Sequence, residues 1–195
     1  MQKGKFIVVE GLDGSGKTTL IENIVNSLNG IVPIKSLIDT LPRGKCIREC
    51  IGNKEYYGND LSIALLYLSE TTRVKDRIVH YLENGNNVIV DRWFYSTMAY
   101  TNNKYIDIID NVSKYLPNID MTIYVDVDID TLIKRISNKL GEDVFTNKDK
   151  LVNVGNCYKE LKMSNQIIFN NNFEDDSYEI NYNNLIEKIK EVIYK

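Results

Sequence analysis

The stretch FIVVEGLDGSGKTTL, residues 6–20, joins an apolar run to a glycine-rich turn and the start of a helical pattern. Residues 6–10 are mostly β-branched and apolar, which predicts a buried strand. Residues 11–18 match the pattern G-x-x-x-x-G-K-[ST] in full. Glycines allow backbone N–H groups to turn inward around phosphate oxygens, and a helix that follows presents its positive end to them. The stretch therefore predicts a phosphate-binding loop.

The chemistry of such a loop assigns roles to two side chains. Lys17 is expected to reach the β and γ phosphates of a nucleoside triphosphate, and the Thr18 hydroxyl to ligate Mg²⁺. The predicted ATP-binding residues of the loop are Gly11, Asp13, Gly14, Ser15, Gly16, Lys17, Thr18 and Thr19. A loop of this kind indicates a triphosphate but does not say what is done with it.

Outward from the loop, short β-like runs alternate with longer helical ones. Strands are predicted at 6–10, 31–34, 88–91, 121–127 and 166–169, and helices at 17–29, 45–51, 61–83, 95–101, 104–116, 129–139, from the polar loop 141–146 through 163, and at 178–194. Strands separated by helices favour βαβ units. The predicted fold class is α/β, with a mostly parallel five-stranded sheet covered by helices on both faces.

Composition excludes several classes of protein. The chain has 195 residues, 43% of them hydrophobic and 26% charged, which is typical of a globular protein with one core. A net charge of -3 argues against a nucleic-acid polymer as partner. The apolar runs are far shorter than the roughly 20 residues that span a membrane. We therefore expect a cytoplasmic protein that does not bind membranes.

Two function classes share the phosphate-binding loop. A GTP-dependent switch usually carries an N-K-x-D motif, and residues 147–150, NKDK, have lysine where the aspartate belongs. A small-molecule kinase needs a second phosphate clamp, and Asp91-Arg92 supplies one at the end of the strand 88–91. Asp91 could hold a magnesium-bound water or orient Lys17, and Arg92 could bind an acceptor phosphate with two hydrogen bonds. The alternative is an Asp91–Arg92 ion pair that closes a strand.

Beyond these motifs the chain resembles the thymidylate kinases. The resemblance rests on VVEGLDGSGKTT at 8–19, GKCIREC at 44–50, IALLYLSETTR at 63–73, VIVDRWFYSTMAYT at 88–101 and YVDVDIDTLIKR at 124–135. It implies a P-loop NTPase fold and one nucleoside monophosphate kinase domain over 1–195, with a lid near 136–148. It also implies Mg²⁺-assisted transfer of the γ-phosphoryl group of ATP to dTMP, and a homodimer. The alternatives are a kinase of another nucleotide or deoxynucleoside, and a nucleotide-binding switch without catalysis.

The resemblance also implies roles for residues around the acceptor. Asp13 would contact the region of the deoxyribose 3′-hydroxyl, and Arg92 would grip the dTMP phosphate. Ser96 and Thr97 would line the base and sugar. The ring of Tyr100 would lie beside the sugar 2′ carbon, where it leaves no room for a ribose hydroxyl.

Three more roles concern the base and the donor. Arg135 matches a basic residue near the ATP adenine or phosphates, and it is the preferred source of a catalytic cation, ahead of Lys139 and Lys148. Tyr67 is expected to stack on thymine, and Arg73 to donate to its O4. Six residues rotate a helix by about 240°, so Arg73 reaches the base only if the helix is distorted. The alternative for Arg73 is an ion pair with Asp76.

Overall fold

The computed structural model describes residues 2–34, 60–140, 148–172 and 176–194. The strands are β1 (Phe6–Gly11), β2 (Ile31–Ile34), β3 (Asn87–Asp91), β4 (Met121–Asp126) and β5 (Gln166–Asn170). The helices are α1 (Lys17–Ser27), α3 (Asp60–Glu83), α4 (Phe94–Tyr100), α5 (Ile106–Ser113), α6 (Ile129–Leu140), α7 (Lys148–Glu160) and α8 (Asp176–Ile193). None of these helices combines the length and apolarity that crossing a membrane requires.

The strands form one five-stranded sheet in the order β2-β3-β1-β4-β5. Every pairing within it is parallel, and Val9 of β1 lies opposite Asp91 of β3. The predicted α/β class with a parallel five-stranded sheet is confirmed. Because all strands run the same way, their carboxyl ends meet at one edge, where ligands bind in folds of this kind.

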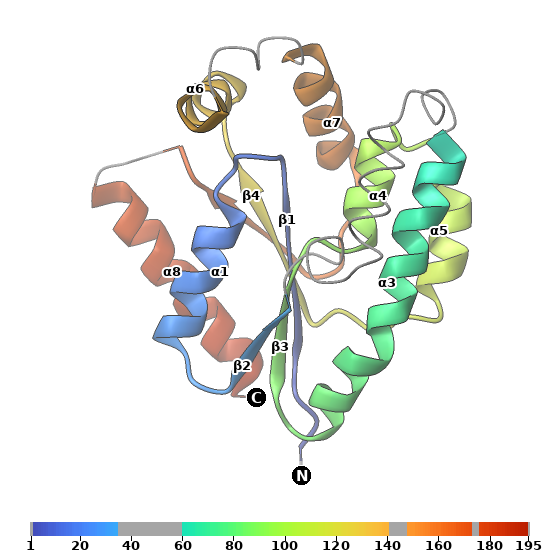
Figure 1. The fold of residues 1–195 in the computed structure, drawn as a ribbon. Helices are drawn as coiled ribbons and strands as arrows, with labels where there is room; N and C mark the ends of the chain where they lie inside the picture. The colour runs from blue at the N-terminus through green and yellow to red at the C-terminus, as the bar shows by residue number, and fades with distance from the viewer. Residues whose placement is uncertain (1, 35–59, 141–147, 173–175, 195) are drawn as a thin grey trace.

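Helices cover both faces of the sheet (Figure 1). Helices α1 and α8 lie together on one side, and α3, α4 and α5 lie on the other. Hydrogen bonds from Asn23 to Tyr178 and between Ser27 and Tyr182 join α1 to α8. The central strand β1 is completely buried from Phe6 to Val9, as expected for a strand with helices on both sides.

Three helices are shorter than predicted, and α1 is the first, since it ends at Ser27 rather than 29. A turn closed by a bond from the Lys104 N–H to the Thr101 carbonyl precedes α5, and Asn102 and Asn103 have left-handed backbones within it (φ 53° and 56°), so α5 starts at Ile106 rather than 104. At the end of α7, the Leu161 N–H bonds to the carbonyl of Tyr158, and the helix ends at Glu160 rather than 163. The predicted helix 45–51 and loop 141–146 lie outside the described residues.

Candidate active site

The glycine-rich loop connects β1 to α1 at the carboxyl edge of the sheet. Gly16 has φ 91°, and a Cβ there would stand 2.5 Å from Nδ2 of Asn171, which donates to the Ser15 carbonyl at 2.7 Å. Asn171 follows the edge strand β5, so this hydrogen bond ties the loop to the end of another strand. Gly16 caps α1 without a side-chain hydrogen bond, so the first N–H groups of α1 have no side-chain acceptor there. These groups can bind an anion.

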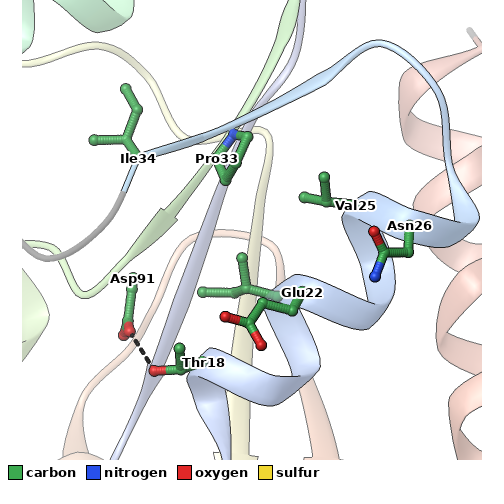
Figure 2. A pocket seen from close by; sticks show the side chains of 8 residues that line it. Thr18, Glu22, Val25, Asn26, Pro33, Ile34 and Asp91 are labelled. Atoms are coloured by element: carbon green, nitrogen blue, oxygen red, sulfur yellow. Dashed lines mark hydrogen bonds between the residues drawn. The ribbon is translucent and has the colours of Figure 1, made fainter.

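Thr18 and Asp91 meet beside the loop, at one end of a pocket between α1 and β2 (Figure 2). The Thr18 hydroxyl donates to Oδ2 of Asp91 at 3.2 Å, and Glu22 points into the same space. The other oxygen of Asp91, Oδ1, is buried and accepts no hydrogen bond from any described residue. The pocket is therefore lined by residues with hard oxygen atoms, and Asp91 among them has a buried oxygen without a partner in the described part of the chain.

This donor set fits Mg²⁺. The described part of the chain has no group of three or more His, Cys, Asp or Glu side chains that could hold a metal ion. Mg²⁺ is usually bound by one or two protein oxygens, with waters and substrate phosphates completing its shell, so a dedicated cage is not required. Thr18 and Asp91 would supply those protein oxygens.

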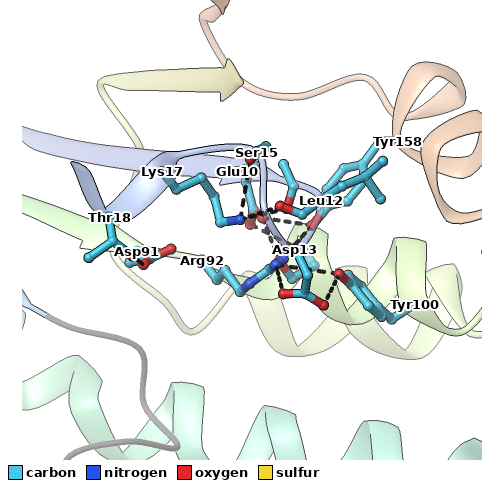
Figure 3. A network of polar contacts seen from close by, with 12 residues as sticks. Glu10, Leu12, Asp13, Ser15, Lys17, Thr18, Asp91, Arg92, Tyr100 and Tyr158 are labelled. Atoms are coloured by element: carbon cyan, nitrogen blue, oxygen red, sulfur yellow. Dashed lines mark hydrogen bonds and ion pairs between the residues drawn. The ribbon is translucent and has the colours of Figure 1, made fainter. Parts of the chain in front are cut away.

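Lys17 is folded back onto the loop (Figure 3). Its ammonium group donates to the carbonyls of Leu12 at 2.6 Å and Gly11 at 3.0 Å, and the residue is only 6% exposed. Burial lowers the pKa of Lys17 to about 7, and the charge of Arg92 acts in the same direction, against three nearby carboxylates. The lysine therefore lacks a strong counter-ion, which triphosphate oxygens would supply.

Arg92 faces the loop through Asp13 and Tyr100. Its Nη2 donates to one oxygen of Asp13 at 2.6 Å, and the Tyr100 hydroxyl donates to the other at 2.7 Å. The guanidinium also lies 5.2 Å from the centre of the Tyr100 ring. Arg92 thus pairs with Asp13 and not with Asp91, so the strand-closing ion pair with Asp91 is wrong. Residues 13, 92 and 100 form one cluster in Figure 3.

Charges in this cluster stabilise one another. Partial burial opposes ionisation of Asp13, but the charge of Arg92 and the bond from Tyr100 outweigh it and lower the pKa of Asp13. Burial likewise opposes the charge of Arg92. The side chains around the guanidinium outweigh this effect and raise its pKa well above the ordinary value; they are Tyr158, Tyr100, Asp13 and Glu10. Arg92 is therefore a permanent cation beside the phosphate-binding loop.

A buried carboxylate, Glu10, lies beneath Arg92 and has no counterpart in the sequence prediction. It is 0% exposed and accepts hydrogen bonds from the Trp93 and Ser96 N–H groups at 2.8 and 3.2 Å, and from the Ser96 hydroxyl at 2.5 Å. The hydroxyl of Tyr158, from α7, donates to Glu10 at 3.1 Å. Burial raises the pKa of Glu10, and these bonds and Arg92 oppose that rise. The only sequence signal was a charge at the end of an otherwise apolar strand.

Comparison with known proteins identifies the family. The family model for thymidylate kinase matches residues 9–181, which is most of the chain. The chain belongs to the thymidylate kinase family. A probable thymidylate kinase of Methanococcus aeolicus is 35% identical over 80% of this chain and 79% of its own. The thymidylate kinase of Dictyostelium discoideum is 30% identical over 99% of this chain and 84% of its own.

A solved structure agrees with the fold of this thymidylate kinase family member. The thymidylate kinase of Candida albicans superimposes with a TM-score of 0.75, covering 98% of this chain and 92% of that one, at 24% identity. That likeness confirms the P-loop NTPase fold expected from the sequence.

The lid-side cations expected in a thymidylate kinase lie on α6 and α7. Arg135 is half-buried on α6, and the next residue, Ile136, lies so close to the loop that a Cβ on Gly14 would stand 2.7 Å from it. Among the described residues Arg135 has no ion-pair partner. Lys148, in contrast, is paired with Asp130 at 3.1 Å. Of these two, Arg135 is the cation that forms no ion pair with a described carboxylate.

Of the two residues predicted for the base, Arg73 is engaged within its own helix. Arg73 forms an ion pair with Glu70, three residues earlier on α3, at 2.9 Å through both Nε and Nη2. The alternative pairing with Asp76 is therefore wrong. Tyr67 is half-buried, about one and two-thirds turns before Arg73. The roles of both residues toward thymine stay predictions.

Ser96 and Thr97 occupy different environments on α4. The Ser96 hydroxyl is engaged by Glu10 and accepts from Arg92 Nη1 at 3.0 Å. Thr97 is 6% exposed, and its carbonyl accepts from the Thr101 hydroxyl. Ser96 thus lies within the Arg92 network, and its role beside the base and sugar, which the resemblance implies, stays a prediction.

Proposed function

We propose that this chain transfers the γ-phosphoryl group of ATP to dTMP, giving ADP and dTDP. The observation that carries the proposal is the position of Arg92. It stands at the carboxyl end of β3 and contacts Asp13 of the phosphate-binding loop at 2.6 Å. One cation for the donor, Lys17, and one for an acceptor phosphate therefore lie at the same edge of the sheet. Family membership supports dTMP as the acceptor.

Phosphoryl transfer depends on positioning and on neutralising charge. In the proposed mechanism the amides at the start of α1 and Lys17 hold the donor phosphates, and Arg92 holds the acceptor phosphate in line with them. The acceptor is already an anionic phosphate oxygen, so no strong general base is required. When bound between Thr18 and Asp91, Mg²⁺ would neutralise charge on the donor phosphates.

The other assignments complete the site. The ring of Tyr100 would exclude a ribose 2′-hydroxyl, with Asp13, Ser96 and Thr97 around the sugar and base. Tyr67 and Arg73 would serve the thymine ring. In the last role, Arg73 can keep its ion pair with Glu70, because only Nε and Nη2 are bound to that carboxylate and Nη1 is left to donate to the base.

Arg135 would contact the ATP adenine or phosphates and supply charge from the lid side. The remaining features expected from the sequence are also part of the proposal: one kinase domain over residues 1–195, a lid near 136–148, a homodimer, and a cytoplasmic location. Helix α3 supports a dimer because Leu65 on it is 48% exposed, and an apolar side chain of this size gains stability when a second copy covers it. Sedimentation of the purified protein at two concentrations measures the oligomeric state.

The proposal is tested by ADP release with each nucleoside and nucleoside monophosphate in turn. We expect dTMP to give the highest kcat/KM. A better acceptor of another class would replace the assignment, and ADP release independent of any acceptor would contradict it.

Two variants test the site itself. Lys17→Ala should abolish transfer while leaving the thermal unfolding transition in place. Arg92→Ala should raise the KM for dTMP far more than that for ATP, because Arg92 contacts only the acceptor in this mechanism. An equal loss for both substrates would remove Arg92 from the acceptor site.

A further inference from the structure

We propose that Glu10 and Tyr158 are positioning residues that fix Arg92 for the acceptor phosphate. The inference rests on the proposed function, because it takes Arg92 to be the acceptor cation. Glu10 and Tyr158 come from β1 and α7 and are 0% exposed. Neither residue reaches the open side of the site, so they act through Arg92 and not on a substrate.

The backbone of Arg92 needs support, which Glu10 provides. Arg92 has φ 69°, a left-handed conformation that is unfavourable for a residue with a Cβ atom. Its own N–H donates to the Val9 carbonyl at 2.9 Å, and the next N–H, that of Trp93, donates to Glu10 at 2.8 Å. Bonds on both sides of the strained residue thus hold it in place. A strained backbone conformation of this kind persists only where several surrounding interactions hold it, and it is common at functional sites.

Glu10 also supplies the cap that α4 lacks. The N-cap residue Trp93 makes no side-chain cap hydrogen bond. Instead, the Glu10 oxygen that binds the Trp93 N–H also accepts from the Ser96 N–H at 3.2 Å, the third position of α4. The Ser96 N–H is shared with the Trp93 carbonyl, also at 3.2 Å, whereas the Trp93 N–H is bound by Glu10. The start of α4, and with it the end of β3, is thereby fixed relative to β1.

The side chain of Arg92 is held through two hydroxyl groups. Its Nη1 donates to Ser96 at 3.0 Å and to Tyr158 at 3.1 Å, and both hydroxyl oxygens lie within hydrogen-bond distance of the second oxygen of Glu10. The two hydroxyls also lie 2.7 Å apart, and each has one hydrogen, so one hydroxyl donates to the other, which in turn donates to Glu10. In either direction both oxygens keep a lone pair that accepts from Arg92, and the carboxylate accepts at the end of the chain of bonds.

The two ends of the guanidinium therefore differ. Nη1 is bound on the buried side, whereas Nη2 pairs with Asp13, whose side chain is 67% exposed. Because the Asp13 side chain is mostly exposed, water can solvate it when a phosphate takes its place at Nη2. Glu10 and Tyr158 hold Nη1 in place while Nη2 exchanges Asp13 for the acceptor phosphate. Removing that hold should weaken the binding of dTMP and leave ATP binding intact.

The test compares Tyr158→Phe and Glu10→Gln with a matched control. Tyr158→Phe removes one hydroxyl and keeps the ring. Glu10→Gln replaces one acceptor oxygen by an NH₂ group. This group would face either the N–H groups at the start of α4 or the hydroxyls of Ser96 and Tyr158, so bonds to Glu10 are lost in both orientations. The control is Tyr124→Phe. It removes a hydroxyl from a buried ring 5.4 Å from that of Tyr158, and this hydroxyl makes no hydrogen bond to Arg92 or Glu10.

We expect Tyr158→Phe to raise the KM for dTMP about tenfold, as for one hydrogen bond to a charged group, with the KM for ATP within about twofold. Glu10→Gln should raise the KM for dTMP more, and Tyr124→Phe should change neither value. In an Arg92→Ala background, Tyr158→Phe should have no further effect on dTMP, because its action runs through Arg92. If Glu10 and Tyr158 only stabilised the fold, the variants would change the KM values for both dTMP and ATP, or neither.

The outcomes separate this inference from the proposed function. If the wild-type protein does not use dTMP, the proposed function fails and the inference fails with it. If the wild type uses dTMP and Tyr158→Phe leaves its KM unchanged, the inference alone is overturned. Glu10→Gln is scored only if its thermal unfolding matches the wild type, and Tyr158→Phe decides the question if it does not. An additive loss in the Arg92→Ala background would also overturn the inference.

Discussion

Binding of ATP should be accompanied by proton uptake at Lys17. In the free protein the ammonium group is buried against two backbone carbonyls, and its pKa is lowered to about 7. Triphosphate oxygens beside it favour the charged form, so its pKa must rise on binding. Above pH 7, therefore, the free protein has largely lost a proton that the complex needs, and affinity falls as the pH rises.

The size of the effect follows from the pKa. If Lys17 is fully protonated in the complex, the free protein binds about half a proton fewer at pH 7 and almost one fewer at pH 8.5. The apparent affinity for ATP should then fall about fiftyfold between pH 7 and pH 9, close to tenfold per pH unit at the upper end. The sign is fixed because the shift in the free protein is downward.

Calorimetric titration with Mg-ATP in two buffers of different ionisation enthalpy measures both quantities. The phosphates of Mg-ATP stay ionised over this range and contribute no proton. Lys17→Arg is the matched control: a guanidinium keeps its charge at these pH values, so whatever binding remains should lose the proton uptake. A pH-independent affinity with no proton uptake in the wild type would refute the argument.

Three further variants, with one control, test other parts of the site. Tyr100→Ala should relax the preference for deoxyribonucleotides over ribonucleotides by about tenfold, measured as a ratio of kcat/KM, whereas an unchanged ratio would move the discrimination elsewhere. Gly16→Ala should weaken ATP binding at least about tenfold, because φ is 91° and the new Cβ meets Asn171. Gly30→Ala, with φ 78° and open space around it, should lower only the unfolding temperature, so equal losses of ATP binding would refute the reasoning. Arg135→Ala should lower kcat by at least about tenfold, and unchanged turnover would exclude Arg135 from the mechanism.

The sequence alone could not decide which carboxylate pairs with Arg73 on helix α3. Arg73 has carboxylates three residues away on both sides, at Glu70 and Asp76, and helix geometry allows either pair. Burial decides between them, because Glu70 is 2% exposed and gains more from a counter-ion. The sequence shows spacing along a helix but not which of its faces meets the rest of the protein.

The local part of this protein was determined by its sequence alone. The strand, the phosphate-binding loop and the helix over residues 6–20 depend on β-branched runs, glycines and helical spacing between near neighbours. The same local patterns predicted the five strands and placed Asp91 and Arg92 at the end of one of them. Such features follow from the sequence because each depends on the conformational preferences of a few adjacent residues.

Tertiary structure decided what surrounds Arg92. Asp13 lies 79 residues from it in the chain, and Glu10 lies 148 residues from Tyr158, yet all four meet at one edge of the sheet. In sequence, Tyr158 was one more aromatic residue in a helical pattern, with no sign of a polar partner. The order β3-β1-β4 and the packing of α7 on α4 bring these side chains together. Pairings across such distances depend on which surfaces bury one another, and that is a property of the whole fold.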